Sequence, residues 1–172
     1  NYLRGIASTL KYDDFELSIF YSNKLTDANV LTYDSRSNTP LEITSLQQSG
    51  LHRTYNEIMD RKVIRQQLYG ANLSYKISNF QLGYTIHRTT LSAELNPENN
   101  VYNLFYFKGR DILNQGLDFY YILKNIVFYG EIAMSDNKGL AGLIGGTFQA
   151  AGYIDFTILY RKKKKNYQCL YS

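Results

Sequence analysis

Apolar and polar residues alternate one by one in several segments of the chain. In residues 15–22, for example, Phe15, Leu17 and Ile19 are separated by Glu16 and Ser18. Successive side chains of a strand point to opposite faces, so this period of two indicates a strand with one apolar and one polar face. The same pattern occurs in residues 69–77, 80–87, 113–123 and 154–161. We therefore predict a strand in each of these segments.

Three further strands are predicted at about 2–12, 126–135 and 139–149, and another begins at Tyr167. Their expected length, about 9–11 residues, is the length with which a tilted strand crosses a bilayer. Strands of soluble proteins average only about 5–6 residues. The predicted fold class is therefore all-β, an antiparallel transmembrane β-barrel of which about eight to nine strands are visible.

The expected connections fall into two size classes. Residues 13–14, 78–79, 124–125 and 150–152 are short and rich in turn-forming residues, whereas residues 25–66 and 88–111 are long and polar. Short turns at one rim and long loops at the other are typical of outer-membrane barrels, in which the short turns are periplasmic. The brief connection at residues 136–138 fits this scheme less well.

The order of the connections adds an expectation about the whole barrel. The first hairpin, at residues 13–14, is of the short periplasmic kind, so the first strand runs from the outside inward. At least one strand is then expected before Asn1. The alternating pattern of Tyr167, Cys169 and Tyr171 suggests a strand that continues further. We therefore expect residues 1–172 to be an internal fragment of one larger β-barrel domain.

The segment 25–66 interrupts the strand pattern and is predicted to be a long loop, either extracellular or folded into the lumen. Within it, Thr54 and Glu57 have the spacing of a capping box, in which each side chain binds a backbone N–H of the first helical turn. We predict a short helix directly after Thr54.

Composition excludes several classes of site. A single Cys cannot form an internal disulfide framework or a Cys-based zinc site, and two His are too few for a His-rich one. No nucleophile–base pair is recognisable, so we expect neither an enzyme nor a cofactor. Of the 17 Tyr, a group that includes Tyr12, Tyr69 and Tyr121 lies mostly near predicted strand ends, where aromatic girdles of membrane barrels occur.

The polar faces of the predicted strands carry the first group of candidate functional residues. These are Glu16, Lys76, His87, Asp118, Glu131 and Asp155. In a barrel they would point into the lumen, where they either line a pore or ligand site or fill the interior with ion pairs and water.

A second group of candidates could bind anions. His52 and Arg53 precede the predicted helix, and a basic run follows Tyr160 and contributes much of the net charge of +4. The run consists of Arg161, Lys162, Lys163, Lys164 and Lys165. It could contact phosphates of lipopolysaccharide or nucleic acid, or be a solvated loop tip; His52 and Arg53 could equally hold their loop together.

Several motifs resemble large outer-membrane proteins of Bacteroidota. They are LRGIA at 3–7, FELSIFYS at 15–22, SGLHRT at 49–54 with Glu57, YGANLSY at 69–75, FYGE at 128–131 and LYR at 159–161. Those proteins carry a periplasmic helix-hairpin-helix region, similar to competence-type DNA-binding modules, before a barrel. The resemblance implies the barrel part only, so any nucleic-acid contact would lie outside this segment.

The expected function is that of a non-catalytic outer-membrane barrel segment in a Gram-negative cell. It would act as a channel wall or as a structural subunit of a transport or secretion complex, in contact with outer-membrane lipid and lipopolysaccharide and with other subunits. Two alternatives stay open. One is a barrel associated with DNA uptake, and the other is a soluble β-sandwich that acts as a binding domain.

Overall fold

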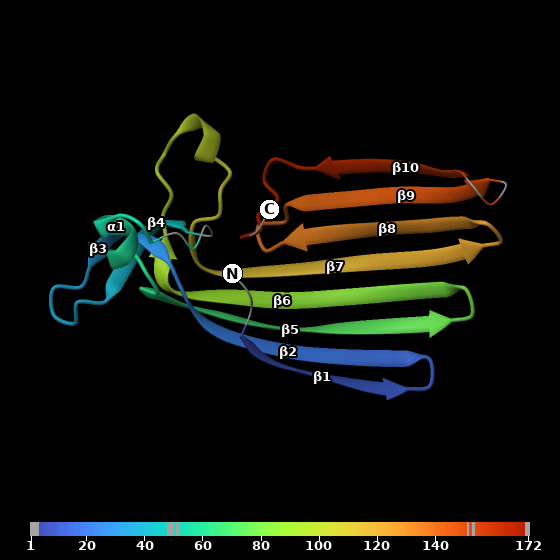
Figure 1. Ribbon diagram of the computed structural model, residues 1–172, viewed down its shortest axis with the longest axis horizontal. Coiled ribbons are helices and arrows are strands. Elements are labelled where there is room, and N and C mark those ends of the chain that lie inside the picture. The colour runs from blue at the N-terminus through green and yellow to red at the C-terminus, as the bar shows by residue number, and fades with distance from the viewer. Residues whose placement is uncertain (1–3, 48–49, 51, 151, 153, 171–172) are drawn as a thin grey trace.

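The computed structural model describes residues 4–47, 50, 52–150, 152 and 154–170 and contains one antiparallel meander of eight strands (Figure 1). In spatial order they are β1 (Gly5–Tyr12), β2 (Phe15–Thr26), β5 (Ile64–Ile77), β6 (Phe80–Leu95), β7 (Gly109–Leu123), β8 (Ile126–Ser135), β9 (Leu140–Ala150) and β10 (Ile154–Lys163). The prediction of an all-β antiparallel architecture is confirmed. The sheet is open, with β1 and β10 at its two edges.

The two predicted classes of connection lie at opposite ends of the sheet (Figure 1). Asp13, Ser78 and Lys124 each begin a two-residue turn with positive φ, at 49°, 48° and 53°. Such turns match the twist of the strands that they join. We call this end the short-turn end and the opposite end the rim.

The segment 25–66 was predicted to be a long loop with a short helix. The structure shows that it also contains a β-hairpin. The hairpin consists of β3 (Ala28–Tyr33) and β4 (Pro40–Leu46), and β4 also pairs in parallel with β6 through Glu42–Glu94 and Ile43–Leu95. The hairpin escaped detection because its register shifts at three places, and each shift breaks the alternation.

The predicted short helix is confirmed as α1 (Tyr55–Met59). The Thr54 hydroxyl accepts a hydrogen bond from the Glu57 N–H at 3.3 Å, and the Glu57 carboxylate accepts from the Thr54 N–H at 3.1 Å. A further N–H, that of Arg53, donates to the same carboxylate at 2.6 Å. These backbone donors lower the pKa of Glu57 below its ordinary value. No helix among the described residues is long and apolar enough to cross a bilayer.

The sheet has one apolar and one polar face, because residues paired between antiparallel strands share a face. One row of paired residues on the apolar face crosses all eight strands: Tyr12, Phe15, Tyr75, Leu82, Phe119, Gly130, Ile144 and Tyr160. The neighbouring row on the polar face is Lys11, Glu16, Ser74, Gly83, Asp118, Glu131, Leu143 and Arg161. The apolar face is exposed; Ile132 and Ile158, for example, retain 64% and 79% of their accessible surface.

Close packing explains two of the four glycines in residues 139–146. A Cβ on Gly145 would lie 2.6 Å from the Tyr129 ring, and one on Gly139 would overlap the backbone of residues 166–167. A Cβ on Gly142 or Gly146 would meet only ordinary contacts. Close neighbours therefore leave no space for a side chain at Gly139 and Gly145.

Apart from Ile112 of β7, the buried apolar side chains of the described residues gather at the rim end of the sheet. Ala28, Ile43, Ile64, Leu91, Ala93 and Leu95 form one cluster, which we call the rim core. Partly buried Val30, Leu46, Val63, Phe107 and Leu170 pack against it. The rim core thus joins the β3–β4 hairpin to the ends of β5 and β6 and to the C-terminal segment.

Strand β6 changes its hydrophobic face where it enters the rim. Ile86 lies on the apolar face, but the next residue of that face is Arg88, which forms an ion pair with Asp111 at 3.1 Å. From Leu91 onward the apolar side chains lie on the other side of the strand and are buried. This inversion concealed the last part of β6, which extends to Leu95. Because β7 begins at Gly109, the predicted loop at 88–111 is too long at both ends.

The predicted strand from Tyr167 is absent from the described residues 164–170. Instead, the chain turns after Lys164, whose carbonyl accepts a hydrogen bond from the Tyr167 N–H at 3.0 Å. The Gln168 N–H then donates to the Ser135 hydroxyl at 3.1 Å. The C-terminal segment therefore folds back against β8 and the rim core.

Candidate functional site

The six candidates from the strands all lie on the polar face of the sheet. Glu16, Asp118 and Glu131 belong to the polar row that crosses the sheet. The other three are Lys76, His87 and Asp155, each an even number of positions from a member of that row. The alternation of residue types thus placed these side chains together on one surface. Among the described residues, none of the six forms an ion pair with another.

Two of the candidates meet at the short-turn end. Glu16 and Lys76 line a hollow of about 460 Å³ together with Lys11, Asp13 and Asp14. Cationic and anionic side chains are nearly balanced here. The arrangement provides a hydrated, mixed-charge surface and no defined catalytic geometry.

Two carboxylates face each other in the middle of the polar face. Asp118 on β7 pairs directly with Glu131 on β8. On the other side, a Cβ on Gly83 would lie 2.6 Å from the Asp118 Oδ2 atom, so the glycine leaves room for the carboxylate. The pair concentrates negative charge, which would favour cations over anions near this part of the surface.

The remaining strand candidates lie apart from these groups. His87 on β6 is half-buried between Gly70 of β5 and Asn114 of β7. Asp155 lies on the edge strand β10 opposite Gln149. In the part of the chain that the structure describes, no group of three or more His, Cys, Asp or Glu is placed to hold a metal ion.

His52 and Arg53 belong to the architecture of the 25–66 segment. The His52 Nε2 atom lies 2.9 Å from the Asp27 carboxylate, whose second oxygen accepts from the Lys62 N–H at 2.8 Å. The Arg53 N–H donates to Glu57 within the capping box. The contacts of Asp27 thus tie the start of β3 to the residues that precede and follow α1.

The basic run at residues 161–165 is divided between two environments. The interpretation of the whole run as a loop tip is wrong, because its first three residues belong to a strand. Arg161, Lys162 and Lys163 belong to β10, and only Lys164 and Lys165 follow it. Lys163 and Lys165 line a pocket at the rim, whereas Lys162 and Lys164 line a different hollow beside the apolar residues of β7 to β9. Lys162 and Lys163 are neighbours on β10 and therefore point to opposite faces of the sheet.

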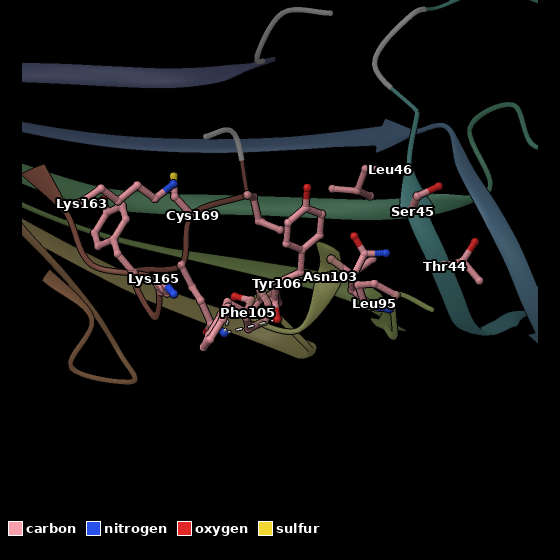
Figure 2. Close-up of a pocket in the computed structure, with 15 residues that line it drawn as sticks. Thr44, Ser45, Leu46, Leu95, Asn103, Phe105, Tyr106, Lys163, Lys165 and Cys169 are labelled. Carbon is pink, nitrogen blue, oxygen red and sulfur yellow. Dashed lines mark hydrogen bonds between the residues drawn. The ribbon is translucent and has the colours of Figure 1, made fainter. Parts of the chain in front are cut away.

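The pocket at the rim, called the rim pocket below, has a volume of about 380 Å³ (Figure 2). Its walls come from β4, from the end of β6 and its connection to β7, and from the end of β10 with the C-terminal segment. Figure 2 shows Ser45 and Leu46 on one side and Lys163 and Cys169 on the other, with Tyr106 between them. Two lysines are its charged lining residues, and no carboxylate lines it among the described residues.

Hydrogen bonds hold the parts of the rim pocket together. The Gln168 side chain donates to the backbone carbonyls of Phe105 and Tyr106, both at 3.3 Å. The Lys163 Nζ atom lies 5.5 Å from the centre of the Tyr167 ring, a cation–π distance. Burial raises the pKa of the Tyr167 hydroxyl, so this group stays protonated and can donate a hydrogen bond.

Sequence reasoning missed most of the rim pocket. It identified Lys163 and Lys165, but not Asn103, Tyr106 or Gln168. The aromatic residues concentrated in 101–107 were a weak signal for this wall. The hydrogen bonds from Gln168 join positions more than 60 residues apart, and no local pattern encodes such contacts.

No family model, curated protein or solved structure matches this chain. The resemblance to Bacteroidota outer-membrane proteins is therefore still an expectation. The function has to be argued from the two faces of the sheet and from the rim.

Proposed function

We propose that this chain forms part of the wall of a Gram-negative outer-membrane β-barrel, with its apolar face toward lipid and its polar face toward the lumen. The observation that carries the proposal is the separation of the two faces. One row of apolar or glycine residues crosses all eight strands, and the adjacent row carries Lys11, Glu16, Asp118, Glu131 and Arg161.

An exposed apolar face of this extent is unfavourable in water. Large exposed apolar patches mark contact with a membrane or another protein. A β-sandwich would cover the face with a second sheet, but the described residues leave it exposed, and Leu73 near its centre retains 45% of its surface. Hydrocarbon of the bilayer is the environment that removes this penalty across all eight strands.

Aromatic residues at one end of the apolar face support the same orientation. The rings of Phe15 and Tyr75 lie 4.8 Å apart, and those of Phe80 and Tyr121 lie 6.3 Å apart. All four lie next to the short turns, and Tyr12 extends the row. Such a belt suits the headgroup layer, because each Tyr has an apolar ring and a polar hydroxyl.

The polar face would contribute the function of the wall. Its charged residues surround a water-filled path if the barrel conducts, and fill the interior if the barrel serves as a structural subunit of a transport or secretion complex. In either case the carboxylates of Asp118 and Glu131 set the local sign of the charge.

Neighbouring positions on β5 test the orientation directly. Leu73→Cys and Ser74→Cys are made in a Cys169→Ser background, and the intact protein is reconstituted in phospholipid vesicles. A small hydrophilic maleimide should label Ser74→Cys quickly and Leu73→Cys slowly, because only the polar face meets water. The labelling rates of the same two variants in mild detergent, without a bilayer, serve as the reference for the rates in vesicles.

Equal labelling of the two cysteines in vesicles, with recovery of the protein in the soluble fraction of cells, would overturn the membrane orientation. Single-channel recordings of the same vesicles then separate the two roles of the polar face. A conducting wall should change its cation preference when Asp118→Asn is introduced, whereas a structural subunit should show no conductance.

A further inference from the structure

We propose that the rim pocket binds a phosphorylated ligand, with the phosphate between Lys163 and Lys165 and a compact organic group against Tyr106 and Leu46. The pocket lies at the rim beside the region that has a buried core of its own, and Lys163 lines it from the end of β10. The inference therefore does not depend on whether the sheet lies in a bilayer.

The charge of the rim pocket points to an anion. Lys163 and Lys165 are its charged lining residues in the described chain, and no Asp or Glu lines it to neutralise them. Lysine is a common phosphate ligand because it acts as a compact point charge with three donors. Glu131 does not line the rim pocket, but it lines a neighbouring hollow together with Lys163 and Tyr167, so Lys165 is the lysine of the pair that shares no hollow with this carboxylate.

Neutral polar groups complete the recognition of an oxygen-rich ligand. Ser45, Asn103 and Tyr106 supply hydroxyl and amide groups around the same space, while Leu46 belongs to the apolar part of the wall. The Thr44 hydroxyl also lines the pocket but donates to the Asn29 carbonyl. Most small-molecule sites combine an apolar lining with a few placed polar groups in this way. A volume of about 380 Å³ is enough for a sugar phosphate or for the phosphate and glycerol of a lipid headgroup.

The rim pocket is built by tertiary contacts and is not an accidental gap between loops. Gln168 ties the C-terminal wall to the carbonyls of Phe105 and Tyr106, and Leu170 packs against the rim core. The connection between β8 and β9 also holds the C-terminal segment, because the Asn137 amide donates to the Asn166 carbonyl at 2.6 Å. A wall held at several points loses little conformational entropy on binding, which favours affinity.

Cys169 provides a direct reporter of occupancy. It lines the rim pocket, and it is the single cysteine of the chain. The intact protein is treated with a maleimide at constant ionic strength while glucose 6-phosphate is added. We expect saturable protection, with the labelling rate falling several-fold. Glucose should give no protection, and inorganic phosphate should protect at higher concentrations.

Three variants, each of which replaces one lysine by glutamine, distinguish binding in the pocket from a general effect of charge. Lys163→Gln and Lys165→Gln should each weaken protection about tenfold, the usual effect of losing one charged hydrogen bond. Lys164→Gln removes a charge from the same run but not from the rim pocket, so protection should persist. Equal loss in all three variants would overturn the proposal.

A lipid arm distinguishes the two sources of phosphate. Vesicles of phosphatidylcholine with phosphatidic acid are compared with pure phosphatidylcholine vesicles. Protection by soluble glucose 6-phosphate assigns the rim pocket to a phosphorylated solute. Protection by phosphatidic acid alone assigns it to a lipid headgroup. Absence of protection by every phosphate tested would overturn the proposal.

Discussion

The sheet and the rim place their apolar side chains in opposite ways. At the rim, Ile43 and Leu91 are almost fully buried in an apolar cluster. In the sheet, apolar side chains such as Ile132 and Ile158 remain exposed, while the buried or half-buried positions include polar ones such as Ser22 and His87. The same chain therefore follows the inside–outside rule of soluble proteins at one end and its reverse along the strands.

The transition between the two regions occurs within single strands. On β6 the apolar residues move from one side to the other between Ile86 and Leu91. At the same level the ion pair of Arg88 with Asp111 takes the place of the apolar row, and the Thr90 hydroxyl donates to Asp111 at 2.6 Å. A charged pair on that side is favourable in water and costly in hydrocarbon, so this level would mark the edge of the lipid-facing band.

The largest difference between the regions should appear when one apolar side chain is shortened in each. Leu91→Ala leaves a cavity in the rim core and should lower the free energy of unfolding by about 2–5 kcal/mol. Ile158→Ala, at an exposed position, should cost far less because fluid surroundings refill the space. Urea titration of both variants in the same vesicles measures the difference, and equal losses would break the comparison.

A smaller effect is expected within the sheet, where glycines permit close contact of strands. A Cβ on Gly70 would lie 2.7 Å from the His87 Cβ and would also overlap the Ile86 carbonyl. Gly70→Ala should therefore cost about 1–3 kcal/mol through overpacking. Gly116→Ala is the matched control on the same face, because its nearest contact would be an ordinary 3.4 Å. If both variants are equally stable in urea, the polar face is loosely packed.

The smallest effect concerns the exposed helix α1 of the rim region. The folded state lowers the pKa of Glu57, so its stabilising contribution is present above the ordinary glutamate value of about 4.3 and is lost as the pH falls through the folded-state pKa. The protection of amides 53–57, taken relative to the intrinsic exchange rate at each pH, should fall over that pH range while the rim core stays protected. Glu57→Gln should abolish the pH dependence, and an unchanged profile in this variant would contradict the assignment.

Local patterns were sufficient to predict much of the sheet. The strand predicted at 126–135 coincides with β8, although its alternation is imperfect. Alternation placed Glu16 and Asp118 on one face, and the Thr54–Glu57 spacing located α1. Bulges concealed β3 and β4, and the inversion concealed the end of β6. The rim pocket depends on contacts between distant segments, so its composition could not be read from neighbouring residues.

The parity of the open sheet restricts how it can be completed. β1 and β10 are the first and last of eight strands in an antiparallel meander, so they run in opposite directions. They can pair with each other directly, or the gap between them can be filled by strands that keep the alternation of direction. A closed antiparallel wall built on this sheet thus grows by whole hairpins, and a single added strand would force one parallel seam.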